Sequence, residues 1–123
     1  WLHANDRRSQ LRAMWQTFFE NIDLLITPIM ATAAFPHIRG VAKQDQRLDV
    51  DNTLKPISDT YFWIGLASAA YLPATPVPAG IDRSGLPIGM QIIGPEAHDR
   101  RCLLLAELLE QGFYRFTPPP GYD

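Results

Sequence analysis

A cluster of three prolines constrains this chain more than any other feature of its sequence. Pro73, Pro76 and Pro78 fall in a short run that leads into the turn-rich segment 79–85. Because proline fixes φ and has no N–H, a strand that contains it cannot donate a full ladder of hydrogen bonds. The run is therefore expected at the edge of a sheet, or where a strand leaves the sheet.

The run that follows this turn is different, because it is almost continuously apolar. Residues 87–93 read Pro-Ile-Gly-Met-Gln-Ile-Ile, a pattern typical of a strand that is covered on both faces. Gln91 interrupts the run with a polar amide, and a buried amide needs hydrogen-bond partners. Gln91 is thus expected either to brace backbone groups or to meet a ligand, and the residues alone leave both roles open.

Composition and charge exclude several classes of protein. The chain has 123 residues, of which 46% are hydrophobic and 20% charged, and its formal net charge is −2. These values are those of an ordinary globular chain, and the scattered Lys and Arg residues give no reason to expect a nucleic-acid partner. Cys102 is the sole cysteine, which excludes an internal disulfide. No apolar run has the length of a membrane span, so a cytoplasmic location is expected.

Hydrophobic periodicity and the positions of Pro and Gly predict the order of elements in a single segment covering residues 1–123. This order predicts an α/β fold with helices layered on a short mixed β-sheet. The second helix is apolar nearly all round, which is typical of a buried helix. The predicted elements are helix 2–21, strand 23–28, a long loop 31–55, helix 56–70, strands 73–80 and 86–93, helix 99–111 and a tail 113–123.

The start of the chain suggests that it is incomplete. It opens on Trp1, without a methionine, inside a pattern that is already helical. Prolines and glycines separate the predicted elements, and these elements are expected to continue in residues that precede Trp1. We therefore expect these residues to be a piece of a longer protein.

Several segments, taken together, resemble the C-terminal part of the amidase signature family. The most specific is Gly85-Leu-Pro-Ile-Gly-Met-Gln-Ile-Ile-Gly94, and Asp23-Leu-Leu-Ile-Thr-Pro28 and Val77-Pro-Ala-Gly80 occur in the family's order and approximate spacing. The piece Ala34-Phe-Pro-His37 resembles one bacterial branch. Tyr71 departs from the pattern, since many members have Gly there. The resemblance implies the larger α/β/α fold of that family and hydrolysis of amide C–N bonds without a metal or organic cofactor.

The resemblance also implies where the chemistry lies. The family uses a nucleophilic Ser, a bridging Ser with a cis peptide bond and a Lys base, all in segments upstream of the part that resembles this chain. The serines present here are not in the family's Gly/Ser-rich context; they are Ser9, Ser58, Ser68 and Ser84. No catalytic residue is therefore expected in this chain, which would supply scaffold and part of the substrate pocket and be inactive alone.

Four residues are candidates for the substrate pocket or for the support behind it. Gln91 either satisfies backbone groups or shapes the cavity, and Met90 precedes it in the same strand. Thr27 ends the first predicted strand, and sites in α/β sheets favour strand ends. His37 follows Pro36 in the long loop and belongs to the branch-specific piece.

Other combinations of reactive side chains have simpler explanations. Lys55 and Ser58 stand three apart at a predicted helix start, where a base–nucleophile pair competes with helix capping and a solvated lysine. The acidic run 45–52 lacks the central Gly and terminal Glu of a calcium loop. The histidines are not at zinc-ligand spacing. No metal site is expected.

The leading hypothesis is therefore the C-terminal fragment of an amide hydrolase that acts on a small-molecule amide through an acyl-enzyme. One rival is a non-catalytic binding or assembly module, and another is the amidase subunit of a tRNA-dependent amidotransferase. The partners expected are the rest of the amidase chain and a second copy that pairs with an exposed sheet edge. Neither nucleic acid nor membrane is expected as a partner.

Overall fold

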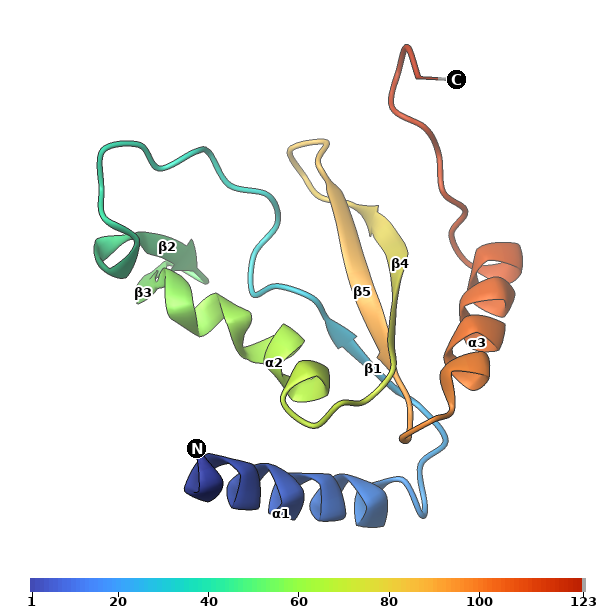
Figure 1. Cartoon of the computed structure of the whole chain (residues 1–123). Coiled ribbons are helices and arrows are strands. Elements are labelled where there is room, and N and C mark those ends of the chain that lie inside the picture. Colours follow the sequence, from blue (N-terminus) through green and yellow to red (C-terminus); the bar gives the residue numbers. More distant parts are fainter. Residues whose placement is uncertain (123) are drawn as a thin grey trace.

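The computed structural model describes residues 1–122 and places helices around a small central sheet, with a separate hairpin (Figure 1). The predicted α/β class is confirmed. The elements are α1 (Leu2–Phe18), β1 (Leu25–Pro28), η1 (Lys43–Asp45), β2 (Arg47–Val50), β3 (Thr53–Pro56), η2 (Ile57–Tyr61), α2 (Phe62–Ser68), β4 (Ala74–Ile81), β5 (Pro87–Ile93) and α3 (Asp99–Gly112). Within residues 1–122, no helix combines the length and the apolar character that crossing a membrane requires.

The central sheet has the strand order β1-β5-β4, so the proline-containing strand β4 lies at an edge, as its sequence predicts. One side of an edge strand has no neighbouring strand, so the N–H groups that Pro76 and Pro78 lack cost no hydrogen bond on that side. Both strand pairs are antiparallel. The mixed sheet expected from the sequence is therefore not present among residues 1–122, because β4 and β5 are joined by a hairpin and β1 returns against β5.

The turn between β4 and β5 is held by one carboxylate. Asp82 Oδ1 accepts hydrogen bonds from the backbone N–H groups of Ser84 and Leu86, both at 2.8 Å. Gly85 takes a φ of +82°, in the left-handed region that suits glycine. The register shifts between Pro78 and Gly80, a bulge that bends β4 near the turn.

The two faces of β5 meet different helices, which lie on opposite sides of the sheet in Figure 1. On the α3 side, Val77, Ile92 and Cys102 form the buried core, and Met90 packs against it. Gln91 points to the other face and contacts α2. Because side chains alternate along a strand, neighbours in sequence are separated by the sheet itself.

The prediction of a loop over residues 31–55 is wrong in its second half. Strands β2 and β3 pair there as an antiparallel hairpin. Asp51 and Asn52 form its tip with φ values of +52° and +62°, the paired left-handed conformation of a two-residue hairpin turn. Polar and apolar residues do alternate over Arg47-Leu-Asp-Val50, but this signal spans only one short strand, and only Leu48 is buried in the hairpin.

The predicted helix 56–70 is also corrected. It is a 3₁₀ turn, η2, followed by the short α2, and it is not buried all round. Ala67 and Ala70 are buried, whereas Phe62 is 61% exposed. Within residues 1–122, Ile64 of α2 is exposed as well, so this helix presents apolar side chains that the described residues do not cover.

The remaining elements keep their predicted order with shifted ends. Helix α1 ends at Phe18 instead of residue 21, and α3 extends one residue beyond the predicted 99–111. Residues 113–122 of the tail have no regular structure, and Phe113 and Phe116 are exposed. The last residue of the predicted tail, 123, lies outside the described residues.

Cys102 is fully buried in the core and should titrate abnormally. Burial raises the pKa of its thiol above the ordinary 9.0, and the negative charge of Asp99 raises it further. The neutral thiol therefore contributes stability below pH 9.0, and this contribution is lost as the pH rises through the raised pKa of the folded state. We expect stability to fall more steeply between pH 8 and 10 in the wild type than in Cys102→Ala, measured by urea unfolding. Parallel curves would contradict this.

Candidate functional site

The candidate site is built around the amide of Gln91 in the central strand. The side chain is only 5% exposed, and its Nε2 donates to Trp63 O at 2.8 Å, Thr27 Oγ1 at 3.0 Å and Pro28 O at 3.2 Å. The two hydrogens on Nε2 thus serve three acceptors, so at least one hydrogen is shared between two acceptors. We call Gln91, Thr27, Pro28 and Trp63 the Gln91 network.

The Gln91 network joins three elements that are far apart in the chain. Thr27 lies directly opposite Gln91 in the β1–β5 register, and its hydroxyl donates to Pro28 O at 3.0 Å. The carbonyl of Trp63 comes from α2, which the amide ties to the sheet. The network therefore fixes the end of β1 and the position of α2 together, and the expectation that a buried Gln91 braces backbone groups is met.

The carbonyl oxygen of the Gln91 amide, Oε1, is free to accept a hydrogen bond. Within residues 1–122, no donor is hydrogen-bonded to Gln91 Oε1, whereas Nε2 has three partners. A carbonyl oxygen of this kind can accept one further N–H or O–H group. Neither Gln91 nor Thr27 lines the cavities beside Arg12, His37, Leu103, Ser58 or Ile88.

Met90 and His37 are not part of this network. Met90 faces α3 and packs against the core of Val77, Ile92 and Cys102. His37 lies in the segment after β1, on the wall of a groove of about 520 Å³. The structure thus brings Gln91 and Thr27 together, and it places Met90 and His37 elsewhere.

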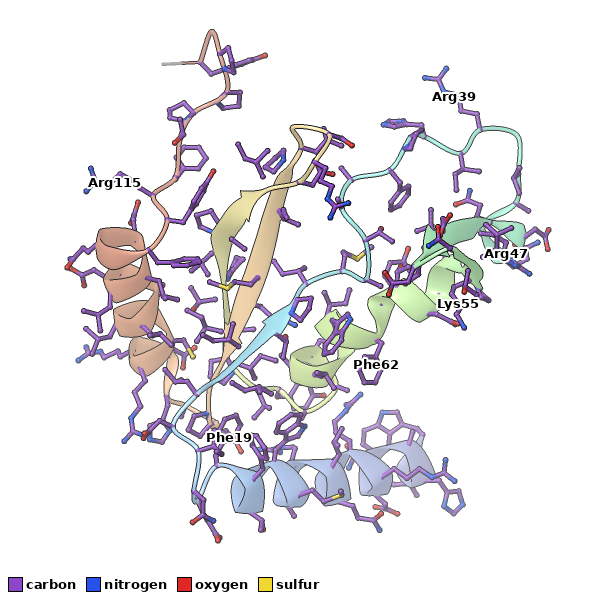
Figure 2. The ribbon with its side chains drawn as sticks, turned by 180° about the vertical axis from the view of Figure 1, so that it is seen from behind. Phe19, Arg39, Arg47, Lys55, Phe62 and Arg115 are labelled. Carbon is purple, nitrogen blue, oxygen red and sulfur yellow. The ribbon has the colours of Figure 1, made fainter. Side chains whose placement is uncertain are left out.

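The groove beside His37 lies between the segment after β1 and the strand β2. The segment 32–38 forms one side, and Arg47 and Asp49 of β2 lie on the other. Figure 2 shows Arg39, just beyond this segment, directed away from the molecule, and Arg47 on the hairpin. The groove therefore has a size suited to a small molecule, and the Arg47 guanidinium beside it is hydrogen-bonded to the carbonyl groups of Gln44 and Gln46.

Thr32, which lines two cavities, was not identified from the sequence. It lines the groove beside His37 and a second cavity of about 210 Å³ that reaches Ile88 and Gly89. Its Oγ1 is buried without a hydrogen-bond partner in the structure. Nothing in the small-residue run around Thr32 signals this position. The acceptor on Trp63 was missed as well, because a main-chain carbonyl has no signature in the sequence.

Reactive clusters are sparse in the described part of the chain. Residues 1–122 contain no group of three or more His, Cys, Asp or Glu side chains that could hold a metal ion. The Ser58 hydroxyl contacts the carboxylate of Asp59 instead of Lys55 or a backbone N–H. Ser9 and Ser68 donate to carbonyl groups of their own helices. None of these three serines is hydrogen-bonded to a lysine or a histidine.

Comparisons with known proteins agree on one family. The model of the Amidase family matches residues 1–103. The A subunit of glutamyl-tRNA(Gln) amidotransferase from Nitrobacter winogradskyi is 31% identical over 119 residues, which are 96% of this chain and 22% of that protein. Its counterpart from Allorhizobium ampelinum is 35% identical over 103 residues, 84% of this chain and 19% of that protein.

A solved structure shows the same fold. The crystal structure of a bacterial aryl acylamidase of the amidase signature enzymes superposes with a TM-score of 0.64 at 21% identity. The match covers 91% of this chain and 24% of that chain. The chain therefore spans between a fifth and a quarter of the length of the Nitrobacter protein and of this acylamidase.

Proposed function

The chain belongs to the Amidase family, and from this premise we propose that it forms part of an enzyme that hydrolyses carboxylic amides. The match of the family over residues 1–103 is the single observation that carries the proposal. In the reaction, a serine oxygen attacks the carbonyl carbon of the amide. The C–N bond breaks, the amine leaves with a proton, and water then hydrolyses the acyl ester.

The nucleophile and its base are proposed to lie in polypeptide outside residues 1–123. Two observations support this division. The chain spans 22% of a curated relative such as the Nitrobacter protein. Ser9 and Ser68 donate to main-chain carbonyl groups and Ser58 to the Asp59 carboxylate, so none of these three is hydrogen-bonded to a lysine. The proposed enzyme needs neither a metal nor an organic cofactor.

Within such an enzyme, the described residues are proposed to form a wall of the substrate site. Gln91 and Thr27 are positioning residues, because they hold backbone groups of β1 and α2 in place. His37 is proposed to line the part of the site that receives the variable portion of the substrate, since it borders a groove of suitable size. Met90 supports the strand from the α3 side.

The purified chain alone is expected to be inactive. Incubated with a panel of simple aliphatic and aryl amides, it should release no amine, and a serine-reactive fluorophosphonate should leave it unlabelled. The control is a longer protein that carries the same residues behind a Gly/Ser-rich segment, which should hydrolyse at least one amide. Turnover by the chain alone that persists through purification would contradict the placement of the nucleophile. A folded longer protein without any amidase activity would contradict the function itself.

A second candidate function is supported by the names of the curated relatives. The relatives at 30–35% identity include the A subunit of glutamyl-tRNA(Gln) amidotransferase from several bacteria. An enzyme of that kind works as one component of an assembly. Adding the partner subunits separates the two candidates: a free amidase hydrolyses simple amides alone, whereas an amidotransferase component becomes active only in the assembly.

The outer edge of β1 is proposed as the attachment point for further polypeptide. Among residues 1–122, β1 pairs with β5 and has no strand on its other side, and unpaired edges recruit strands. The rest of the amidase chain is the proposed occupant, and a second copy takes its place in the isolated chain. A cytoplasmic location is proposed, because a lone, buried Cys102 suits a reducing compartment.

A further inference from the structure

Helix α1 is attached to the rest of the structure almost entirely through side chains. None of its residues is buried, and within residues 1–122 the backbone hydrogen bonds of its two ends stay inside the same segment. It lies across one end of the sheet in Figure 1. Between α1 and the segment 95–101 a cavity of about 330 Å³ remains. The apolar packing of this helix is therefore partial, with Leu11 and Trp15 half-buried.

Tyr71 marks the point where α1 meets the turn between α2 and β4. Its φ is +58°, and Leu72 N donates to Ala67 O at 3.1 Å across it. This is the left-handed position that closes a helix C-terminus and is most often taken by glycine. Tyrosine adopts it at a cost. Its side chain is 60% exposed, so burial does not offset that cost.

Two arginines of α1 bind the Tyr71 ring. The Arg8 Cζ lies 4.8 Å from the ring centroid, and its Nη1 donates to the Tyr71 hydroxyl. The Arg12 Cζ lies 5.9 Å from the same centroid. Because the two arginines stand four residues apart, they share one face of the helix. Guanidinium groups in this arrangement are attracted by the face of an aromatic ring.

A carboxylate completes the contact. Arg12 also forms an ion pair with Glu96, in the segment between β5 and α3. The side chains of Arg8, Arg12, Tyr71 and Glu96 thus connect α1, the α2–β4 turn and the β5–α3 segment. We call these four residues the Tyr71 latch. The core of Val77, Ile92 and Cys102 includes no residue of α1.

We propose that the Tyr71 latch docks α1 reversibly, so that the helix opens as a unit while the sheet stays folded. When the latch opens, α1 loses its tertiary contacts, and an isolated helix of its length is marginal in water. Its amides then exchange with solvent. The amides of β5 are held by the sheet on both sides and remain protected.

Hydrogen exchange of the 123-residue chain tests the proposal. In Tyr71→Gly, the amides of residues 2–18 are expected to exchange about tenfold faster, because both cation–π contacts are lost. The amides of β5 should exchange at the wild-type rate or more slowly, because glycine relieves the left-handed strain at position 71. Tyr71→Phe is the matched control. It keeps the ring and the strain, and it should accelerate α1 exchange only about twofold.

A second pair of variants keeps the test decisive if Tyr71→Gly fails to fold. Arg8→Lys and Arg12→Lys preserve the charge of α1 but replace the planar guanidinium that stacks on the ring. Both should accelerate exchange in residues 2–18 and leave β5 unchanged. Unchanged α1 exchange in the Gly and Lys variants would overturn the proposal. So would equal acceleration in α1 and β5, since it would show that the two unfold together.

Discussion

Replacement of Gln91 by leucine is expected to lower the free energy of unfolding by about 3 kcal/mol. The substitution keeps the side-chain volume but removes the donor that serves Trp63 O, Thr27 Oγ1 and Pro28 O. The buried hydroxyl of Thr27 and the part-buried carbonyl groups of Trp63 and Pro28 then lose this donor. Urea unfolding, followed by circular dichroism, measures the loss as a lower midpoint at unchanged slope.

A matched control lies on the surface of α3. Gln111 is exposed, and its amide contacts Glu107 at 3.2 Å, so Gln111→Leu should change stability by less than about 0.5 kcal/mol. The variant Gln91→Glu provides a second test of the Gln91 network. Its ionised carboxylate would face the acceptors that Nε2 now serves, so this variant should be less stable than Gln91→Leu at pH 7 and recover as the pH falls. Equal stability of the wild type and Gln91→Leu would refute the role of the Gln91 network.

The second large effect is expected at Gly94, immediately after β5. A Cβ placed there would lie 2.7 Å from Cys102 Sγ and 3.2 Å from Leu24 Cδ2. Both neighbours belong to the core or pack against it, so they have little room to move. We expect Gly94→Ala to lower the free energy of unfolding by about 2 kcal/mol through overpacking, measured by urea unfolding.

A double variant identifies the cause. In Gly94→Ala with Cys102→Ala, the sulfur that collides with the new methyl group is absent, so the two substitutions should cost at least about 1 kcal/mol less together than the sum of their separate effects. Gly112→Ala is the control, because no atom lies within 4 Å of its Cβ position; alanine should be neutral or slightly stabilising at this helix end. Additive losses in the double variant would show that Cys102 is not the obstacle.

Much of the fold could be predicted from local rules. Prolines at positions 76 and 78 exclude a central strand, and β4 lies at the sheet edge. The apolar run around Gln91 predicts a strand at the centre, and β5 occupies it. The hairpin of β2 and β3 escaped prediction because its alternating pattern covers only four residues, Arg47 to Val50, and its turn is made by Asp51 and Asn52 in left-handed conformations, without a glycine.

The candidate site was predicted only in part, for a physical reason. The sequence marks Gln91 as a buried amide that needs partners, but it does not say which partners. Met90 and Gln91 are neighbours in the chain, yet they belong to different layers, because the sheet lies between their side chains. Thr32 lines two cavities, one that forms where the segment after β1 meets β2 and one where it meets β5.

By itself, the sequence determines the α/β class, the edge position of the proline strand and the need of Gln91 for partners. Each follows from residue types a few positions apart, where backbone sterics and side-chain period act. The tertiary structure alone decides that Gln91 binds Thr27, 64 residues away, and that Arg8 binds Tyr71, 63 residues away. Such pairs depend on register and on the packing of whole elements, which no local pattern in the chain encodes.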